Sequence, residues 1–206
     1  MGSWHSSEKK WICVFCASAA GASPEYLRAA TELGRRIAEQ GYGLVYGGAT
    51  VGAMGAVADG ALAAGGAVVG VIPDIIKERE IEHRGLTELH VVRTMHERKA
   101  MLAERADAFV ALPGGYGTLD EFIEIVTWAQ LRIHAKPCVL VNISGFFDGF
   151  LSFLDHTVRE GFIQPENRGL VQVARDPEEA LAIVERTWAE RAEVPAHDKR
   201  LDAVVR

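Results

Sequence analysis

The sequence has few of the features that mark specialised protein classes. It contains three cysteines and seven prolines among 206 residues, with no repeat, low-complexity block or proline-rich linker. Three cysteines do not make a disulfide framework, so we expect a reducing, cytoplasmic environment. The apolar run at 11–17 is too short to span a bilayer. It also lacks the preceding basic segment of a secretion signal.

The sequence also has fewer basic than acidic residues. Lysine and arginine total 22 against 28 aspartates and glutamates, which gives a net charge of −6 and a pI near 5.7. This balance argues against a general nucleic-acid or acidic-membrane binder, because neither polyanion would be attracted. A local basic pocket for one small anion is still compatible with it. The hydrophobic share of 49% is typical of one globular domain that needs no disulfide or metal to fold.

Short apolar segments alternate along the chain with longer amphipathic ones. The predicted strands are 11–17, 43–48, 67–73, 88–93, 108–114, 137–142 and 169–174. The predicted helices are 24–40, 52–65, 94–106, 118–132, 147–160 and 176–191. Most of the strands are continuously apolar, which is typical of strands covered on both faces. The order predicts an α/β fold, a single-domain Rossmann-like, doubly wound parallel sheet of about seven strands with helices on both faces.

We assign this domain to residues 11–190. Residues 1–10 are expected to be a disordered or non-native segment, and residues 191–206 a polar tail. In doubly wound sheets, ligands bind in the loops at the carboxyl ends of the strands. The loops concerned are 16–23, 47–55, 74–84 and 113–121.

Two of these loops are glycine-rich turns that lead from a strand into a helix. The first, GGATVGAMG at 47–55, has the context in which backbone N–H groups and a helix N-terminus bind phosphate. It does not match the GxGxxG fingerprint, and no acidic residue ends the second strand to hold a dinucleotide ribose. The alternative interpretation is close packing of helix on sheet.

The second turn, PGGYGTLDE at 113–121, has three glycines in four positions, which opens backbone conformations closed to other residues. Thr118 is predicted to be an N-cap, with Glu121 completing a capping box, so both residues could serve only to start the helix. That interpretation leaves the glycines unexplained. A phosphate bound here would meet Asp120 and Glu121, and it would therefore need positive charge from elsewhere.

The segment MHERK at 95–99 is the candidate source of that charge. Arg98 suits bidentate contact with a phosphate or carboxylate, and Lys99 supplies a second cation. The alternative is a solvated basic turn on a surface helix. Basic residues at a helix N-terminus oppose the helix dipole, however, so their placement requires an explanation.

The cysteines and histidines do not form a recognisable site. Cys13 and Cys16 match CxxC, but residues three apart on a strand point to opposite faces, which disfavours a redox motif. No Cys/His set has zinc spacing, and no GxSxG, HExxH or Walker A string is present.

Taken together, MHERKAMLAERADAFVALPGGYGTLDE and TWAQLRIHAKP closely resemble the Lonely Guy family of cytokinin riboside 5′-monophosphate phosphoribohydrolases, long labelled possible lysine decarboxylases. The turn at 47–55 is similar to the family's other signature. The sequence departs from the family pattern at Ala49 and Arg132, where glycine is common, and at Asp120, where glutamate is common. No lysine has a pyridoxal-phosphate context, so the decarboxylase label finds no support.

The resemblance implies hydrolysis of the N-glycosidic bond of cytokinin riboside 5′-monophosphates, and of AMP, to free base and ribose 5-phosphate. It implies that Arg98 and Glu121 are the catalytic pair. The substrate-binding candidates are Lys99, Gly114, Gly115, Tyr116, Gly117, Thr118, Leu119, Asp120 and Thr127, with Ser18, Gly48 and Glu80 from the other loops. We expect no metal, organic cofactor, nucleic acid or membrane partner. A homodimer is expected, since the apolar residues of the helix at 122–131 cover more than one stripe.

Two other functions stay open. One is a nucleotide-binding carrier or sensor of the same fold that does not turn over its ligand. The other is a redox or dinucleotide protein, which the missing ribose-binding acid disfavours. The presence of both Arg98 and Glu121 favours an enzyme over a binder.

Overall fold

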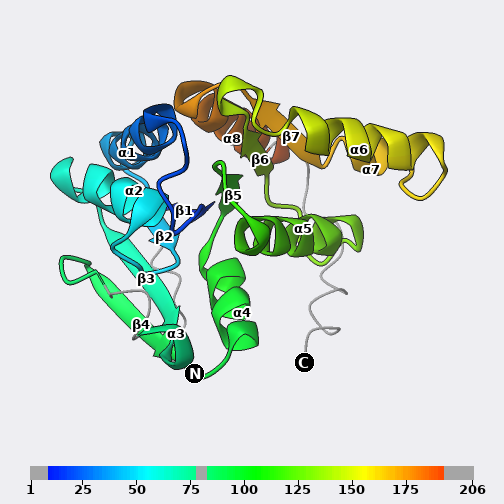
Figure 1. Ribbon diagram of the computed structural model, residues 1–206. Helices are drawn as coiled ribbons and strands as arrows, with labels where there is room; N and C mark the ends of the chain where they lie inside the picture. Colours follow the sequence, from blue (N-terminus) through cyan, green and yellow to red (C-terminus); the bar gives the residue numbers. More distant parts are fainter. Residues whose placement is uncertain (1–8, 78–82, 193–206) are drawn as a thin grey trace.

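The structure, a computed structural model, describes residues 9–77 and 83–192. Its strands form one parallel sheet in the order β4-β3-β2-β1-β5-β6-β7, drawn in Figure 1. The strands are β1 (Trp11–Phe15), β2 (Gly43–Tyr46), β3 (Val68–Pro73), β4 (Glu88–Val92), β5 (Ala108–Ala111), β6 (Cys138–Val141) and β7 (Val171–Ala174). All the predicted strands and the doubly wound fold class are confirmed.

The helices follow the predicted order as well. They are α1 (Pro24–Glu39), α2 (Gly52–Ala63), α3 (Asp74–Lys77), α4 (Met95–Arg105), α5 (Tyr116–Gln130), α6 (Asp148–Arg159), α7 (Pro165–Arg168) and α8 (Pro177–Ala192), with the 3-10 helix η1 (Ile143–Gly145). The short helices α3, α7 and η1 were not predicted, because three or four residues are too few to show a helical period. No helix in the described ranges is long and apolar enough to cross a membrane.

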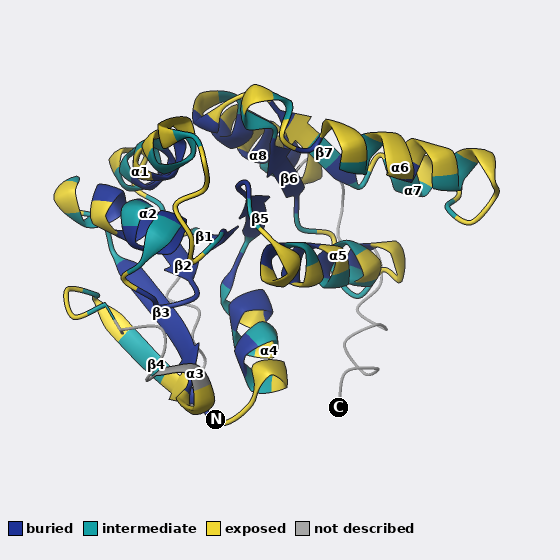
Figure 2. Cartoon of the chain, in the orientation of Figure 1, coloured by how far each residue is buried: buried dark blue, intermediate teal, exposed yellow. Residues whose placement is uncertain are grey.

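The helices cover the sheet in two layers (Figure 2). One apolar cluster joins α1, α2 and α8 to the sheet, and a second joins α4, α5 and α6 to it. Alternate residues of β1 enter different layers: Ile12 and Val14 belong to the first cluster, and Cys13 and Phe15 to the second. The continuous apolar character of the strands therefore reflects burial on both faces.

Glycines allow α1 and α2 to approach closely. A Cβ on Gly34 would lie 1.9 Å from the carbonyl oxygen of Val57, and a Cβ on Gly60 would lie 2.1 Å from that of Thr31. Neither position can carry a side chain without separating the two helices. Part of the glycine content of this sequence is thus explained by packing.

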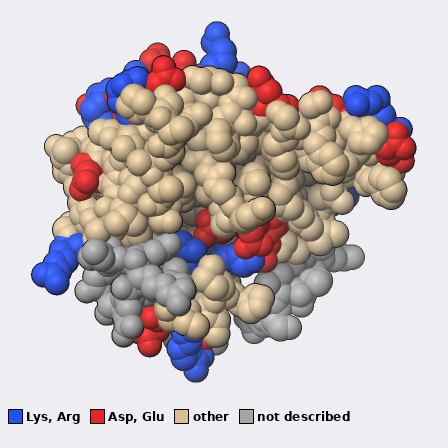
Figure 3. Space-filling model, in the orientation of Figure 1, with Lys and Arg blue, Asp and Glu red and all other residues tan. Residues whose placement is uncertain are grey.

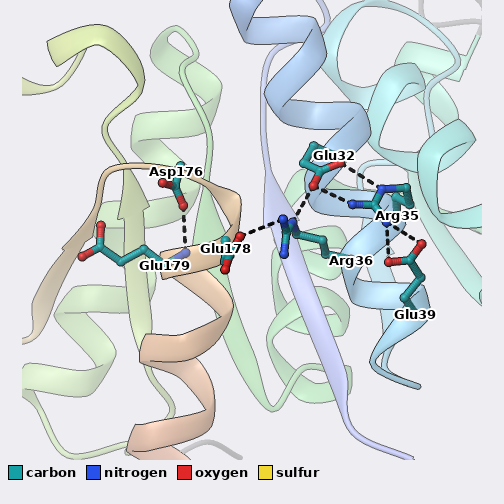
Figure 4. Close-up of polar contacts among 7 residues, drawn as sticks. All are labelled: Glu32, Arg35, Arg36, Glu39, Asp176, Glu178 and Glu179. Carbon is teal, nitrogen blue, oxygen red and sulfur yellow. Dashed lines mark hydrogen bonds and ion pairs between the residues drawn. The ribbon is translucent and has the colours of Figure 1, made fainter.

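Charged side chains join the outer surfaces of α1 and α8 (Figure 4). Glu32 pairs with both Arg35 and Arg36, and Arg36 also reaches Glu178 at 2.8 Å. Because these side chains are partly or largely exposed, the pairs contribute little individually to stability. They account for part of the charge of the chain without implying a binding site.

The order of strands fixes where a ligand can bind. β1 pairs with β2 on one side and with β5 on the other, so the direction of winding reverses between β1 and β5. In doubly wound sheets the ligand crevice lies at such a reversal, outside the carboxyl ends of the strands. The loop after β1 and the turn that leads from β5 into α5 both lie there.

Candidate functional site

A buried ion pair joins α4 to α5. Nη1 of Arg98 lies 2.8 Å from Oε1 of Glu121, and each side chain is only 8% exposed. Nε of Arg98 donates to the carbonyl oxygen of Val71 in β3 at 3.1 Å. The interpretation of Arg98 as part of a solvated basic turn is therefore wrong.

The local structure of α4 explains why Arg98 points inward. Thr94 caps the helix by accepting the N–H of Glu97 at 3.1 Å, which starts α4 at Met95. Arg98 then shares the buried face with Leu102, one turn later. At the end of β2, a Cβ on Gly47 would lie 2.2 Å from Nη2 of Arg98, so glycine there makes room for the guanidinium.

The start of α5 differs from the prediction. The helix begins at Tyr116 with Gly115 as N-cap and without a side-chain cap, so the capping box of Thr118 and Glu121 is wrong. Thr118 is buried in the first turn, where its Oγ1 would lie 2.1 Å from a Cβ on Gly114. The glycines let the backbone enter the helix before Thr118. Glu121 is thereby placed to meet Arg98 rather than the helix end.

The N-terminus of α5 is open. Tyr116 is 95% exposed, and a Cβ added to Gly115 or Gly117 would meet no described atom within 4 Å. The first intrahelical bond runs from the N–H of Leu119 to the carbonyl oxygen of Gly115 at 3.1 Å. Amides of the first turn have no acceptor within their own helix, and together with the helix dipole they favour an anion.

Lys99 lies beside this opening between two carboxylates. Its Nζ is 3.2 Å from Oδ2 of Asp120 and 3.1 Å from Oε1 of Glu124, and its side chain is 13% exposed. Burial lowers the pKa of Lys99, but hydrogen bonds to Glu124 and Asp120 outweigh it and raise the pKa above its usual value. The ammonium therefore stays charged. Glu124 was not predicted, although its position three residues after Glu121 places both on one face of α5.

Figure 3 shows the charge of this region. Acidic and basic side chains gather together where α4 approaches α5, whereas much of the surrounding surface carries neither. A carboxylate paired with a guanidinium, next to an open helix N-terminus, can stabilise a cationic transition state on a ligand that is anchored through its own anion.

The first glycine turn has a different structure. Gly48 and Gly52 have φ angles of +81° and +59°, which only glycine adopts readily. The N–H groups of Ala53 and Met54 donate to carbonyl oxygens of the loop after β1, at 3.4 and 3.2 Å. These donors at the start of α2 are thus already engaged by protein, and close packing accounts for much of the turn.

Other predicted site residues lie on separate elements of the fold. Gly48 is buried, and Ser18 is exposed in the loop after β1. Thr127 is exposed and donates its hydroxyl to the carbonyl oxygen of Ile123 at 2.8 Å; six residues from Glu121, it lies on another face of α5. The structure does not bring Thr127 to the ion pair within one chain. Glu80 lies outside the described residues.

The three thiols are enclosed by the protein. Cys13, Cys16 and Cys138 are free and buried. Burial raises the pKa of Cys13 and Cys16 far above the ordinary range, and the nearby charge of Glu121 raises both further. A thiol held in its neutral form is a poor nucleophile and metal ligand. Within the described parts of the chain, no three His, Cys, Asp or Glu side chains are placed to hold a metal ion.

Known proteins that resemble this chain in sequence belong to one family. Residues 54–184 match the family described as possible lysine decarboxylase. A cytokinin riboside 5′-monophosphate phosphoribohydrolase of Rhodococcoides fascians is 49% identical over 176 residues, covering 85% of this chain and 89% of the relative. A cytokinin riboside 5′-monophosphate phosphoribohydrolase of Arabidopsis thaliana is 46% identical over 179 residues, covering 87% of this chain and 82% of the relative.

Solved structures share the fold at lower identity. A molybdenum cofactor carrier protein from Chlamydomonas reinhardtii superposes with a TM-score of 0.65 at 28% identity, covering 88% of this chain and 99% of that one. A molybdenum cofactor binding protein from Rippkaea orientalis gives a TM-score of 0.66 at 25% identity, covering 88% and 98% of the two chains.

Proposed function

We propose that this chain, which belongs to the Lonely Guy family described as possible lysine decarboxylases, is a cytokinin riboside 5′-monophosphate phosphoribohydrolase. The reaction is hydrolysis of the N-glycosidic bond to free base and ribose 5-phosphate. AMP is a further substrate, because its phosphate and ribose are the same and only the substituent on the base differs.

The buried pair of Arg98 and Glu121 carries this proposal. A carboxylate is retained inside the protein, at 2.8 Å from a guanidinium, next to an open helix N-terminus. Burying such a pair contributes little to stability, because desolvation of both charges offsets their attraction. Its place beside a potential anion site favours chemistry over scaffolding.

The substrate's 5′-phosphate binds at the first turn of α5. The amides that follow Gly115 and the ammonium of Lys99 supply the positive field, and the exposed glycines leave room for the phosphate. Anchoring the phosphate positions the ribose over Glu121, so that binding energy from a remote group is used at the reacting carbon.

Cleavage exchanges one bond at C1′ of the ribose for another. As the bond from C1′ to the base nitrogen breaks, its electron pair stays with the base and positive charge develops on the ribose. Glu121 stabilises this charge and orients the water whose oxygen bonds to C1′. One proton of the water stays on the new C1′ hydroxyl, and the other is transferred to the nitrogen of the departing base. Arg98 holds the Glu121 carboxylate in place and offsets its repulsion of the phosphate.

A molybdenum cofactor carrier is the second candidate function. The shared fold and the coverage of nearly the whole carrier chain favour it. The phosphoribohydrolases are far closer in sequence, however, and a carrier needs no buried carboxylate beside its phosphate. If this protein binds nucleotide without hydrolysing it, the carrier function becomes the better candidate.

Exposed apolar side chains near α5 and three free thiols bear on the assembly and the compartment of the protein. We propose a homodimer in which the outer face of α5 meets a partner, because Ile123 on α5 and Leu131 at its C-cap are 37% and 59% exposed. We place the protein in the cytoplasm, where its three free thiols would stay reduced, and we assign the hydrolase domain to residues 11–190.

The test compares phosphorylated with unphosphorylated substrates. Purified protein is incubated with isopentenyladenine riboside 5′-monophosphate, AMP and the two matching nucleosides, and the free base is quantified by chromatography. We expect base release from both monophosphates and at least about a hundredfold slower release from the nucleosides, since the phosphate supplies the anchor. Equal turnover of AMP and adenosine would contradict the assignment.

A further inference from the structure

Glu124 has an unusual environment for a carboxylate. Its Oε1 contacts Lys99 at 3.1 Å, whereas its Oε2 is buried and accepts no hydrogen bond from any described residue. A buried polar atom without a partner costs free energy, so its retention calls for an explanation. Packing of α4 against α5 does not need it, because an apolar side chain would fill the same space at a lower cost.

The two carboxylates that hold Lys99 differ in exposure. The side chain of Asp120 is 60% exposed, and that of Glu124 is 26% exposed. Asp120 lies near the open end of α5, and Glu124 lies one turn further along the helix. An arriving phosphate would repel Asp120, whose exposed side chain can turn into solvent, whereas the Oε2 atom of Glu124 is buried.

We propose that Glu124 is a positioning residue that fixes the ammonium of Lys99 at the mouth of α5, while Asp120 is the exchangeable partner that releases Lys99 to the 5′-phosphate. The inference rests on the proposed function, because it assigns the substrate's phosphate to this end of α5. Lys99 is thus held in place before the substrate arrives, and little side-chain entropy is lost on binding.

A purely electrostatic role for Glu124 leads to the opposite expectation. If Glu124 acts only as a negative charge near the anion, its neutralisation strengthens anion binding, as neutralisation of Asp120 does. If Glu124 positions Lys99, its neutralisation frees the lysine and weakens anion binding despite the lost repulsion. The sign of the effect therefore separates the two roles.

The experiment measures binding without turnover. Ribose 5-phosphate, which retains the anchoring phosphate and has no glycosidic bond to the base, is titrated calorimetrically into wild type, Glu124→Gln, Asp120→Asn and Lys99→Met. We expect about tenfold weaker binding for Glu124→Gln and tighter binding for Asp120→Asn. In a Lys99→Met background, Glu124→Gln should no longer weaken binding, because there is no ammonium left to position. Glu166→Gln, at an exposed carboxylate on α7, is the matched control.

Kinetics on AMP complete the test. Glu124→Gln should raise KM about tenfold and leave kcat within about twofold, because the phosphate is anchored less well while the Arg98–Glu121 pair is intact. Glu124→Asp keeps the charge but shortens the reach to Lys99, so it should also weaken binding and would serve if the Gln variant does not fold.

Three outcomes would overturn the inference. The first is tighter or unchanged binding in Glu124→Gln, and the second is unchanged binding in Glu124→Asp. The third is a loss of affinity on adding Glu124→Gln to Lys99→Met that equals the loss in the wild-type background. If wild type binds ribose 5-phosphate but hydrolyses no nucleotide, the proposed function fails while the positioning role is still tested by calorimetry.

Discussion

The two glycine-rich turns of this protein look alike in sequence and differ in structure. Each follows a buried strand and starts a helix. In the turn at 47–55, glycines adopt positive φ angles and the first amides of α2 bind the preceding loop. In the turn at 113–121, Gly115 and Gly117 face open space and α5 starts without a side-chain cap. The first turn is closed by the protein itself, and the second is left open.

The comparison shows that glycine has two separable uses in such turns. Within the first turn, a Cβ on Gly52 would lie 2.3 Å from the carbonyl oxygen of Ser18, so the missing side chain permits close backbone packing. Within the second turn, the missing side chains of Gly115 and Gly117 leave space that no described atom fills. The sequence alone does not separate the two uses, because both appear in it simply as glycine.

The strongest test of the open turn is Glu121→Gln. The substitution keeps the shape of the side chain and removes its charge, so we expect at least a hundredfold loss of kcat, equivalent to roughly 2.7 kcal/mol of barrier. Binding of ribose 5-phosphate should survive or tighten, because a carboxylate near the phosphate is gone. Steady-state kinetics and calorimetry on the same preparation measure both, and near-normal turnover would remove Glu121 from the chemistry.

Arg98→Ala should lose turnover together with binding. It removes the cation beside the phosphate and leaves Glu121 buried without its guanidinium, which also costs about 3–5 kcal/mol of stability. Urea unfolding establishes whether the variant is folded before its activity is compared. Weaker binding in Arg98→Ala than in Glu121→Gln is the expected contrast; tighter binding in Arg98→Ala would contradict a role in holding the anion.

Gly52→Ala tests the closed turn. An alanine there combines a φ of +59° with a clash against backbone, so we expect a loss of at least about 2 kcal/mol in the free energy of unfolding. The KM for AMP measured on the folded fraction should be nearly unchanged. A raised KM with full stability would show that the first turn binds the substrate directly.

Gly117→Ala tests the open turn by the opposite pattern. The added methyl has open space and improves helix propensity, so stability should be kept or rise by up to about 1 kcal/mol. The same methyl occupies space at the proposed phosphate site, so KM should rise about tenfold. Unchanged kinetics in Gly117→Ala would place the phosphate elsewhere.

The smallest effect concerns the far end of α5. Nε2–H of His134 donates to the carbonyl oxygen of Ile125 at 2.9 Å, and its Nδ1 accepts the N–H of Lys136 at 3.1 Å. Burial lowers the pKa of His134 to about 4 from an ordinary 6.5. The unfolded chain therefore binds a proton that the folded chain excludes, and stability should fall as the pH drops from about 6.5 to about 4.

Thermal unfolding across this pH range checks the expectation. His134→Gln should flatten the pH dependence of Tm, and substitution of His156, whose side chain is 53% exposed, is the matched control. Parallel curves for wild type and His134→Gln would show that His134 does not anchor this end of α5 in its neutral form.

The sequence predicts the fold better than the site. Apolar strands of β-branched residues and the helices between them are local patterns, so their order and the parallel sheet follow directly. The start of α5 could not be predicted in the same way, because Thr118 and Glu121 match the capping pattern at the correct spacing. A more distant partner, Arg98, determines the position of Glu121.

The contacts of Lys99 illustrate the same limit. Its proximity to Asp120 and Glu124 depends on how α4 and α5 pack, which no spacing within either helix specifies. The helical period indicates that Glu121 and Glu124 share a face, but not which helix that face meets. Arg132, which departs from the family pattern in the sequence, has a φ of +60°, a backbone conformation that favours glycine.

The central position of β1 has a consequence for the synthesis of the chain. β1 needs β5 on one side, yet residues 16–107 must be made before β5 is available. At about 5–20 residues per second, translation of that segment takes on the order of 5–20 s. During this interval β1, β2, β3 and β4 can pair, but the other edge of β1 is an apolar strand without a neighbour, open to pairing with other nascent chains. The edge of β1 in the middle of the finished sheet therefore waits longer for its partner strand than any other paired edge of the sheet.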